Sequence, residues 1–209
     1  MNNNQESNII NTPIIRFLTK EEINKIAAGQ VVERPESIIK ELVENAIDAK
    51  AHLIKISCLN GGKTSITVTD NGIGMSKEDL CRCILPHTTS KITEHSDSLN
   101  LINTYGFRGE ALSSISGVST ITIMTRQEKN DHGYILSCSE GIAGENPIEA
   151  PMTKGTSITV TNLFESIPAR KKFLKTKESE WNAIKQTFIA LASVNFSIYF
   201  GSSFSDTSL

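Results

Sequence analysis

Two neighbouring runs of alternating apolar and polar residues constrain the fold of this chain most strongly. Residues 53–59 and 65–70 carry apolar side chains at alternate positions, which is typical of strands with one buried face. Gly61 and Gly62 lie between them and suit a tight turn. A helix pattern with Pro35 in its first turn runs to about Ala49. This part of the chain is therefore predicted to form a helix followed by an antiparallel hairpin.

Further helices and strands are predicted along the chain. Thr19 and Glu22 form a capping box at the start of a helix that we expect Gly29 to end. Ser76 and Asp79 cap another short helix. The other expected elements are a helix at 108–116 ended by Gly117, strands at 118–125, 134–137 and 156–161, and an amphipathic helix at 176–193 capped by Thr176.

Composition narrows the class of protein. The chain has 209 residues, which suits one domain or one domain plus the start of a second. A net charge of −2 argues against a stand-alone nucleic-acid binder, because duplex affinity depends on cationic contacts to phosphates. Only Cys81 and Cys83 lie close together among the four cysteines, so we expect neither a zinc site nor a disulfide scaffold. We find no signal peptide and no apolar run long enough to span a bilayer.

The helix KELVENAIDA, residues 40–49, is the first segment that could carry chemistry. Glu41, Asn45 and Asp48 lie on one side of it, opposite an apolar arc. A carboxylate can activate water, and an amide oxygen one turn away can bind Mg²⁺. A solvated helix face explains the same pattern, and the helix alone does not decide between the two.

Three further segments suggest ligand contacts. Asp70 ends a strand in DNGIGM, where it could accept a hydrogen bond from an exocyclic amino group such as that of adenine, while its glycines allow close backbone approach. HTTSK, residues 87–91, is the third of the four candidate segments along the chain. In the fourth, residues 106–112, glycines lead into a helix N-terminus, which favours anions. An ordinary turn and an ordinary helix start are the alternatives. A P-loop and a dinucleotide fingerprint are both incomplete, since Ser57 and Lys77 replace required glycines.

Together, KELVENAIDA, DNGIGM, HTTSK and YGFRGEALSSIS resemble, in order and spacing, the GHKL ATPases, which include gyrase, a heat-shock chaperone and histidine kinases. GFRGEAL, AAGQVVERPESIIKELVENAIDA and SIPARKKFL are similar to the MutL family of DNA mismatch-repair proteins. The likeness covers residues 14–200. It implies an α/β (α+β) two-layer sandwich, the Bergerat ATP-binding fold, with a mixed, largely antiparallel sheet, helices on one face, and nucleotide between helices and a lid.

The resemblance implies ATP and Mg²⁺ as cofactors and a role for each residue on the first helix segment. Glu41 would be the catalytic general base that activates the attacking water. Asn45 would hold Mg²⁺ on the phosphates, with Asp48 in support. Gln30 and Ser166-Ile167 depart from the usual family residues, but no proposed catalytic group is lost.

The resemblance also implies the nucleotide contacts. Asp70 would bind the adenine amino group, Gly74 would lie beside the base, and Thr156 would back the pocket. Residues from about Pro86 to Thr104 would form the lid. The remaining contacts would be Ser90 and Lys91 in the lid and Gly106, Arg108, Gly109, Glu110, Ala111 and Leu112 around the phosphates.

Domain boundaries and partners follow from the same resemblance. We expect a flexible polar arm at 1–13, a GHKL ATPase domain at 14–195, and at 196–209 the start of a second domain or a disordered tail. Because family members add a second domain with a γ-phosphate lysine, we expect weak or absent ATP turnover by this chain. Expected partners are a MutS-type mismatch sensor, a downstream nuclease or helicase, and a second copy in an ATP-dependent homodimer, with no membrane.

DNA contact would be weak and would use the basic segment Arg170–Lys177. The expected compartment is the cytoplasm, or the nucleus in a eukaryote. Two alternatives remain open. One is another GHKL enzyme, such as a histidine kinase, which would need an upstream phosphoacceptor helix pair. The other is a module that binds nucleotide without turnover.

Overall fold

The computed structural model describes residues 15–17, 19–86, 88, 109–144 and 146–205. Its helices are α1 (Lys20–Val31), α2 (Pro35–Asp48), the 3₁₀ turn η1 (Asn60–Gly62), α3 (Lys77–Arg82), α4 (Ala111–Gly117), α5 (Pro168–Phe173) and α6 (Lys177–Val194). Its strands are β1 (Leu53–Leu59), β2 (Ser65–Asp70), β3 (Thr120–Arg126), β4 (Gly133–Ser139), β5 (Ile142–Ala143), β6 (Ile148–Ala150), β7 (Gly155–Thr161) and β8 (Tyr199–Ser205).

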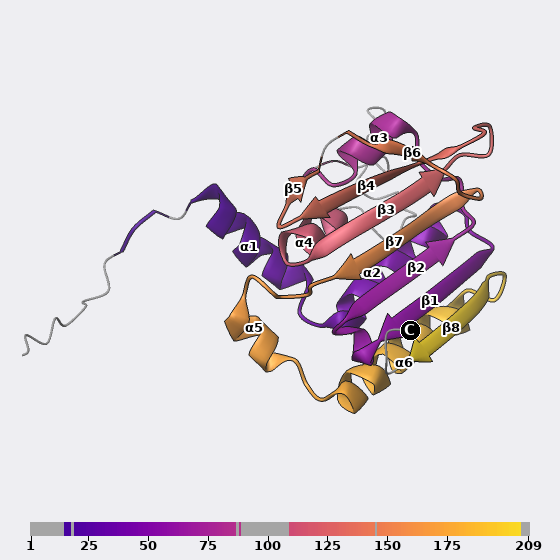
Figure 1. Cartoon of the computed structure of the whole chain (residues 1–209). Helices are drawn as coiled ribbons and strands as arrows, with labels where there is room; N and C mark the ends of the chain where they lie inside the picture. Colours follow the sequence, from indigo (N-terminus) through magenta and orange to yellow (C-terminus); the bar gives the residue numbers. More distant parts are fainter. Residues whose placement is uncertain (1–14, 18, 87, 89–108, 145, 206–209) are drawn as a thin grey trace, which may run out of the picture.

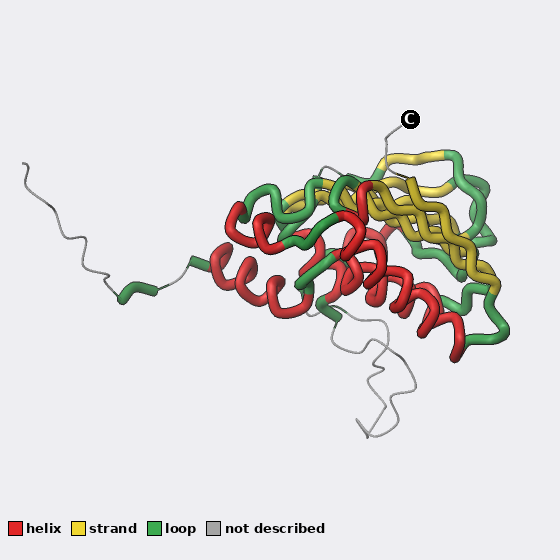
Figure 2. The backbone as a smooth tube through the Cα atoms, turned by 90° about the horizontal axis from the view of Figure 1, so that it is seen from below, coloured by secondary structure: helices red, strands yellow, loops and turns green. Residues whose placement is uncertain are grey.

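The strands form one sheet in the order β5-β4-β3-β7-β2-β1-β8, with β6 paired to β4. Among the described strands, β1 and β8 are parallel and the other pairs are antiparallel. Figure 1 shows the strands side by side, and Figure 2 shows the helices in a separate layer on one side of them. The predicted two-layer fold with a mixed, largely antiparallel sheet is confirmed.

The core lies between these two layers. Inward positions alternate along each strand, as the sequence pattern requires, and α2 contributes the matching apolar surface. Fully or almost fully buried members include Ile38, Ile39, Leu42 and Val43 of α2 and Ile54, Ile56, Ile66, Val68, Ile121 and Ile123 of the sheet. Burying such a side chain is worth about 1.5–3 kcal/mol, so this contact fixes how α2 sits on the sheet.

Helix α1 continues past Gly29 to Val31, so the expected end at Gly29 is wrong. The reason is a side chain far away in sequence. Arg170 donates to the carbonyl oxygens of Gly29 at 2.8 Å and Val32 at 3.1 Å, and a Cβ on Gly29 would collide with its guanidinium. The glycine therefore allows a close approach of α5 rather than ending the helix.

We expected the ATPase domain to end at residue 195, but the chain after this residue continues into the same sheet. Residues 199–205 form β8 and pair in parallel with β1, so they extend the same sheet. The ring of Phe200 packs edge-on against Phe188 of α6, with centroids 5.6 Å apart. This contact helps to hold β8 against the sheet edge after α6. The Ser- and Gly-rich sequence of β8 lacks the apolar alternation that would predict a strand. Residues 206–209 and the predicted arm at 1–13 lie outside the described residues.

A buried ion pair connects α6 to the start of α2. Glu180 is completely buried, and its Oε2 lies 3.1 Å from Arg34 Nη2. Its Oε1 accepts from the Lys175 backbone N–H at 2.7 Å.

The part of the chain that the structure describes holds no helix of the length and apolarity that a membrane span requires.

Replacing Arg34 by alanine leaves the buried Glu180 carboxylate without its cation. We expect Arg34→Ala to lower the free energy of unfolding by about 3–5 kcal/mol, measured by urea denaturation. The control is Lys171→Ala, which removes an exposed ion pair with Glu165 and costs about 1 kcal/mol or less. Equal losses in the two variants would contradict the structural role given to Glu180.

Candidate functional site

The orientation of α2 decides where its polar residues lie. Ile38, Ile39, Leu42 and Val43 are buried in the core, which largely matches the predicted apolar arc. The opposite face is not simply solvated, because Glu41, Asn45 and Asp48 are half-buried while Lys40 is exposed. A partly buried polar face on a core helix favours a site over a surface.

The loop after β2 packs against the C-terminal end of α2. The Ile73 N–H donates to the Ala49 carbonyl at 2.9 Å, and a Cβ on Gly72 would lie 2.7 Å from the same oxygen. Gly74 has φ +69°, and any side chain there would collide with the Arg126 carbonyl. Both glycines are therefore required for the close approach of the loop, and this packing brings Asp70 to the end of the helix that carries Asp48 and Asn45.

Asp70 lies in a cross-strand row on the inner face of the sheet. It pairs with Thr156 of β7, which in turn pairs with Thr125 of β3. The Asp70 Oδ1 accepts the Gly72 N–H at 2.7 Å. Burial raises the pKa of Asp70 from 3.8 to about 6, while hydrogen bonds from the backbones of Gly72 and Thr156 oppose this rise. The row provides a carboxylate next to a nearly buried hydroxyl.

Thr125 is a member of this row that the sequence analysis did not identify. It is completely buried, and its Oγ1 accepts the Met75 N–H at 2.8 Å. The same oxygen lies 3.1 Å from Thr156 Oγ1. The signal was present in the sequence, because Thr125 occupies the inward position that follows Ile121 and Ile123 in the alternation.

The predicted anion segment is described in part. Gly109 has φ +63°, and Glu110 and Ala111 stand at the start of α4, which contacts α1 and α2. Leu112 is half-buried against the core. Ser90, Lys91, Gly106 and Arg108, and most of the predicted lid, lie outside the described residues. Thr88 of HTTSK caps the end of the α3 region, donating to the carbonyls of Arg82 and Leu85 at 2.8 Å.

The oxygen donors on the polar face of α2 suit a divalent cation that is held mainly by the phosphates of a nucleotide. Within the described ranges, no group of three or more His, Cys, Asp or Glu side chains could hold a metal ion. The Asn45 amide on the half-buried face of α2 offers one hard oxygen donor one turn from Glu41. Mg²⁺ typically takes one or two protein oxygens plus phosphates and waters, so these residues fit it in a nucleotide complex.

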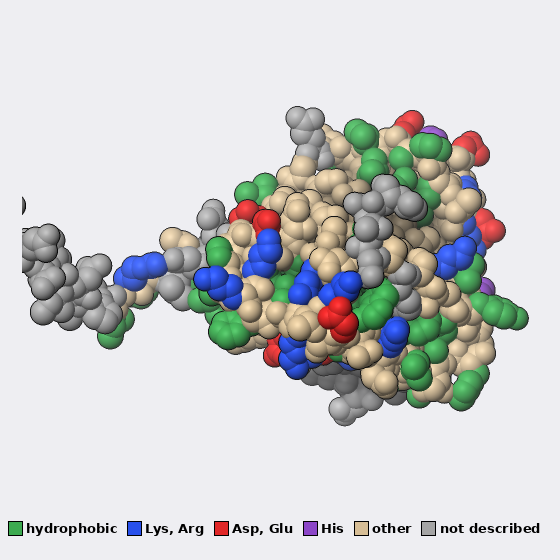
Figure 3. All heavy atoms as spheres, turned by 60° about the horizontal axis from the view of Figure 1, so that its bottom comes forward, with side chains coloured by type: hydrophobic (Ala, Val, Ile, Leu, Met, Phe, Trp, Pro, Cys, Tyr) green, Lys and Arg blue, Asp and Glu red, His purple; other side chains and the backbone are tan. Residues whose placement is uncertain are grey.

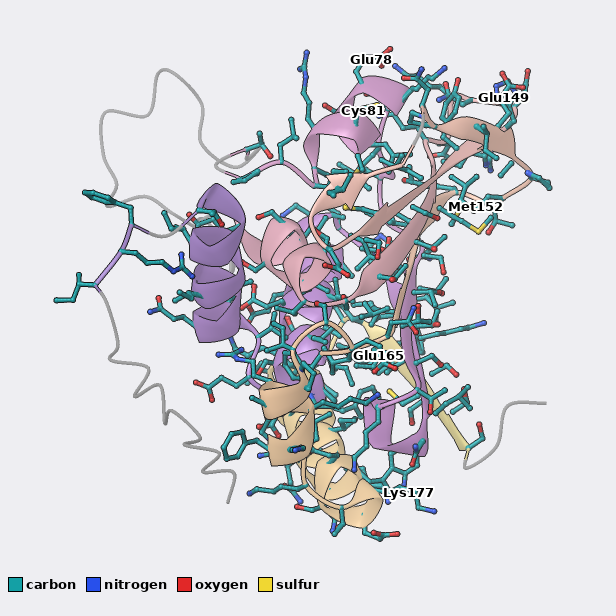
Figure 4. The ribbon with its side chains drawn as sticks, turned by 60° about the vertical axis from the view of Figure 1, so that its left-hand side comes forward. Glu78, Cys81, Glu149, Met152, Glu165 and Lys177 are labelled. Carbon is teal, nitrogen blue, oxygen red and sulfur yellow. The ribbon has the colours of Figure 1, made fainter. Side chains whose placement is uncertain are left out.

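The basic segment, which includes α5, lies on the opposite side of the molecule from α3 and β6 (Figure 1). Figure 4 shows Glu165 and Lys177 toward one end of the molecule, with Glu78 of α3 and Glu149 of β6 toward the other. Lys171 pairs with Glu165, which neutralises part of the segment. Figure 3 shows Lys and Arg side chains on the lower face interspersed with hydrophobic ones.

Residues 32–166 match the family model of histidine kinase-, DNA gyrase B- and HSP90-like ATPases, and the chain belongs to this family. Within it, the sequence is similar to DNA mismatch repair protein MutL. The identity is 48% over 185 residues with MutL of Clostridium botulinum, covering 88% of this chain and 27% of that protein. It is 45% over 188 residues with MutL of Phocaeicola vulgatus, covering 90% and 30%.

Solved structures give the same result. The Aquifex aeolicus MutL ATPase domain complexed with ADP superposes with a TM-score of 0.69 at 29% identity, covering 84% of this chain and 61% of that one. The N-terminal domain of a DNA repair protein superposes with 0.75 at 29% identity, covering 90% and 54%. The GHKL fold and the likeness to MutL are confirmed, and the chain spans less than a third of the length of the two MutL relatives above.

The raised pKa of Asp70 predicts that the parent and the Asp70→Asn variant differ in stability by an amount that depends on pH. Because the folded chain favours the protonated carboxyl, ionising Asp70 destabilises the fold as pH rises from 3.8 through about 6. Since one pKa unit corresponds to 1.36 kcal/mol, the loss is about 3 kcal/mol at neutral pH. We expect Asp70→Asn to be more stable than the parent at pH 7.5 and equal to it near pH 4, by urea denaturation.

The matched control is Asp131→Asn, which changes an exposed carboxylate in the β3–β4 turn. It should leave the free energy of unfolding almost unchanged at both pH values. A difference between Asp70→Asn and the parent that is the same at pH 4 and pH 7.5 would show that Asp70 is not held in an unfavourable ionised state.

Proposed function

We propose that this chain is the ATP-binding and ATP-hydrolysing module of a MutL-type DNA mismatch repair protein. The observation that carries the proposal is the packing of the Asn71–Met75 loop against the end of α2. It brings the Asp70 carboxylate to the C-terminal end of α2, the helix whose half-buried face carries Glu41, Asn45 and Asp48. The family match and the ADP complex of a similar ATPase domain support the same ligand.

Recognition of the base follows from the chemistry of the row. An ionised Asp70 accepts a hydrogen bond from the adenine amino group, and the hydroxyl of Thr156 lies beside it on the next strand. Gly74 lies beside the base, and its missing side chain lets the loop pack against the Arg126 carbonyl at the end of the sheet. At the start of α4, Gly109, Glu110, Ala111 and Leu112 would contact the phosphates through backbone.

Hydrolysis follows from the polar face of α2. Glu41 is the general base that takes a proton from the attacking water, and its half-buried position keeps it from being fully solvated. Asn45 holds Mg²⁺, and Asp48 supports that contact. When bound, the cation neutralises charge on the phosphates, so the protein contributes mainly positioning and electrostatic stabilisation.

The wider role in repair rests on the MutL relatives. ATP binding drives dimerisation with a second copy, and the closed dimer transmits mismatch recognition by a MutS-type sensor to a nuclease or helicase. Lys172 and Lys175 of the basic segment are exposed and contact DNA weakly. Since the relatives named above are bacterial proteins, the expected compartment is the cytoplasm.

Removing the general base separates binding from hydrolysis. We expect Glu41→Gln to retain ATP affinity within about threefold and to lower the single-turnover hydrolysis rate roughly 10²–10⁴-fold. Enzyme in excess over labelled ATP allows the rate to be measured even when turnover is slow. Binding is measured by displacement of a fluorescent nucleotide.

The control is Glu44→Gln on the same helix. Glu44 is buried and pairs with Lys40 at 3.1 Å, so its loss affects stability but not the attacking water. Hydrolysis at the parent rate by Glu41→Gln, or an equal loss in both variants, would contradict the role proposed for Glu41.

A further inference from the structure

We propose that Thr125 is a positioning residue that makes the base pocket select a purine with an amino group. It does so by fixing the direction of the hydrogen bond at Thr156. This inference rests on the proposed ATP site, because Thr125 acts on the base through Thr156 and touches no ligand itself.

The contacts of Thr125 join three parts of the pocket. Its Oγ1 accepts the Met75 N–H at 2.8 Å and donates to the Gly155 carbonyl at 3.2 Å. It also lies 3.1 Å from Thr156 Oγ1. Thr125 is 0% exposed and Thr156 is 7% exposed, so of the two residues only Thr156 retains any exposed surface through which a ligand could be contacted.

The number of protons on the Thr125 and Thr156 hydroxyls decides which of the two donates the hydrogen bond between them. A hydroxyl has one proton and two acceptor lone pairs. On Thr125, the proton goes to Gly155, one lone pair accepts from Met75, and the second lone pair is left for the Thr156 proton. The two threonine hydroxyls and the Met75 N–H are then all hydrogen-bonded, which is the arrangement that folding favours for buried polar groups.

Thr156 is consequently an acceptor toward the ligand. With its proton engaged with Thr125, Thr156 offers only lone pairs to a ligand that lies beside Asp70, its cross-strand neighbour. Two adjacent acceptors favour the N–H donors of an amino group and oppose a carbonyl oxygen at the same position. A buried mismatch of this kind gives strong discrimination, because unpaired polar groups are costly.

The same hydroxyl also sets the position of the glycine loop. Met75 follows Gly74, and its N–H is held by Thr125, while Gly155 begins β7. An isosteric valine would leave the Met75 N–H and the Thr156 hydroxyl without this partner. The hydroxyl at position 125, rather than the volume of the side chain, is therefore what the pocket requires.

The test compares ATP with ITP, in which a carbonyl replaces the amino group at the same ring position. We expect the parent to bind ATP more tightly, and Thr125→Val to lower the ratio of ITP Kd to ATP Kd at least fivefold. Thr125→Ser restores the hydroxyl and should keep the ratio within about twofold of the parent. Kd values are measured by displacement of a fluorescent nucleotide.

Thr122→Val is the control for loss of a threonine hydroxyl on the same strand. Thr122 lies on the outer face, where its Oγ1 is 3.1 Å from Ser137 Oγ, and its loss should leave the ratio unchanged. If Thr125→Val does not fold, Thr125→Cys, whose sulfur hydrogen-bonds weakly, must show the same fall in the ratio.

An equal loss of affinity for ATP and ITP in the Thr125 variants would overturn the inference and leave Thr125 with a structural role only. Parent protein that binds neither nucleotide would overturn the proposed function instead. A Thr125→Ser variant that behaves like Thr125→Val would also contradict the inference, since the hydroxyl is present in one and absent in the other.

Discussion

The burial of one face of α2 in the core, against α6 and the sheet, is the contact on which the rest of the site depends. Ile38, Ile39, Leu42 and Val43 are at most 2% exposed, and turning the helix would expose them to water. At about 1.5–3 kcal/mol for each side chain, the rotation of α2 is strongly determined. The direction of Glu41, Asn45 and Asp48 is therefore a consequence of core packing.

The second constraint is the close approach of backbones at the end of the sheet. Gly74 contacts the chain at Arg126, and Gly155, with φ +121°, lies against the Asp70 carbonyl with no room for a Cβ. Thr125 joins these two glycine segments by hydrogen bonds to Met75 and to Gly155 itself. The pocket thus combines a helix set by apolar packing with a strand end set by glycines and one buried hydroxyl.

Sequence patterns predicted what depends on local periodicity. The arc of α2, the hairpin of β1 and β2 and the capping of α3 by Ser76, which accepts the Asp79 N–H at 3.0 Å, are all local features. The patterns missed features that depend on contacts between distant segments. Arg170 donates to the Gly29 carbonyl, and α1 continues past this glycine. The parallel pairing of β8 with β1 depends on α6, which returns the chain to the sheet edge. The role of Thr125 needs its neighbours Met75 and Thr156, which sequence spacing does not supply. The roles of individual site residues came from the family resemblance and stay predictions.

We propose that a purine nucleotide binds between the polar face of α2 and the end of the sheet. The most direct measurement is a titration of ¹⁵N-labelled protein with ADP and Mg²⁺, followed by backbone amide chemical shifts. We expect the largest shifts at residues 70–75, at 155–156 and at 41–48 if the nucleotide binds there. Shifts confined to the basic segment Arg170–Lys177, with the loop after β2 unchanged, would contradict it.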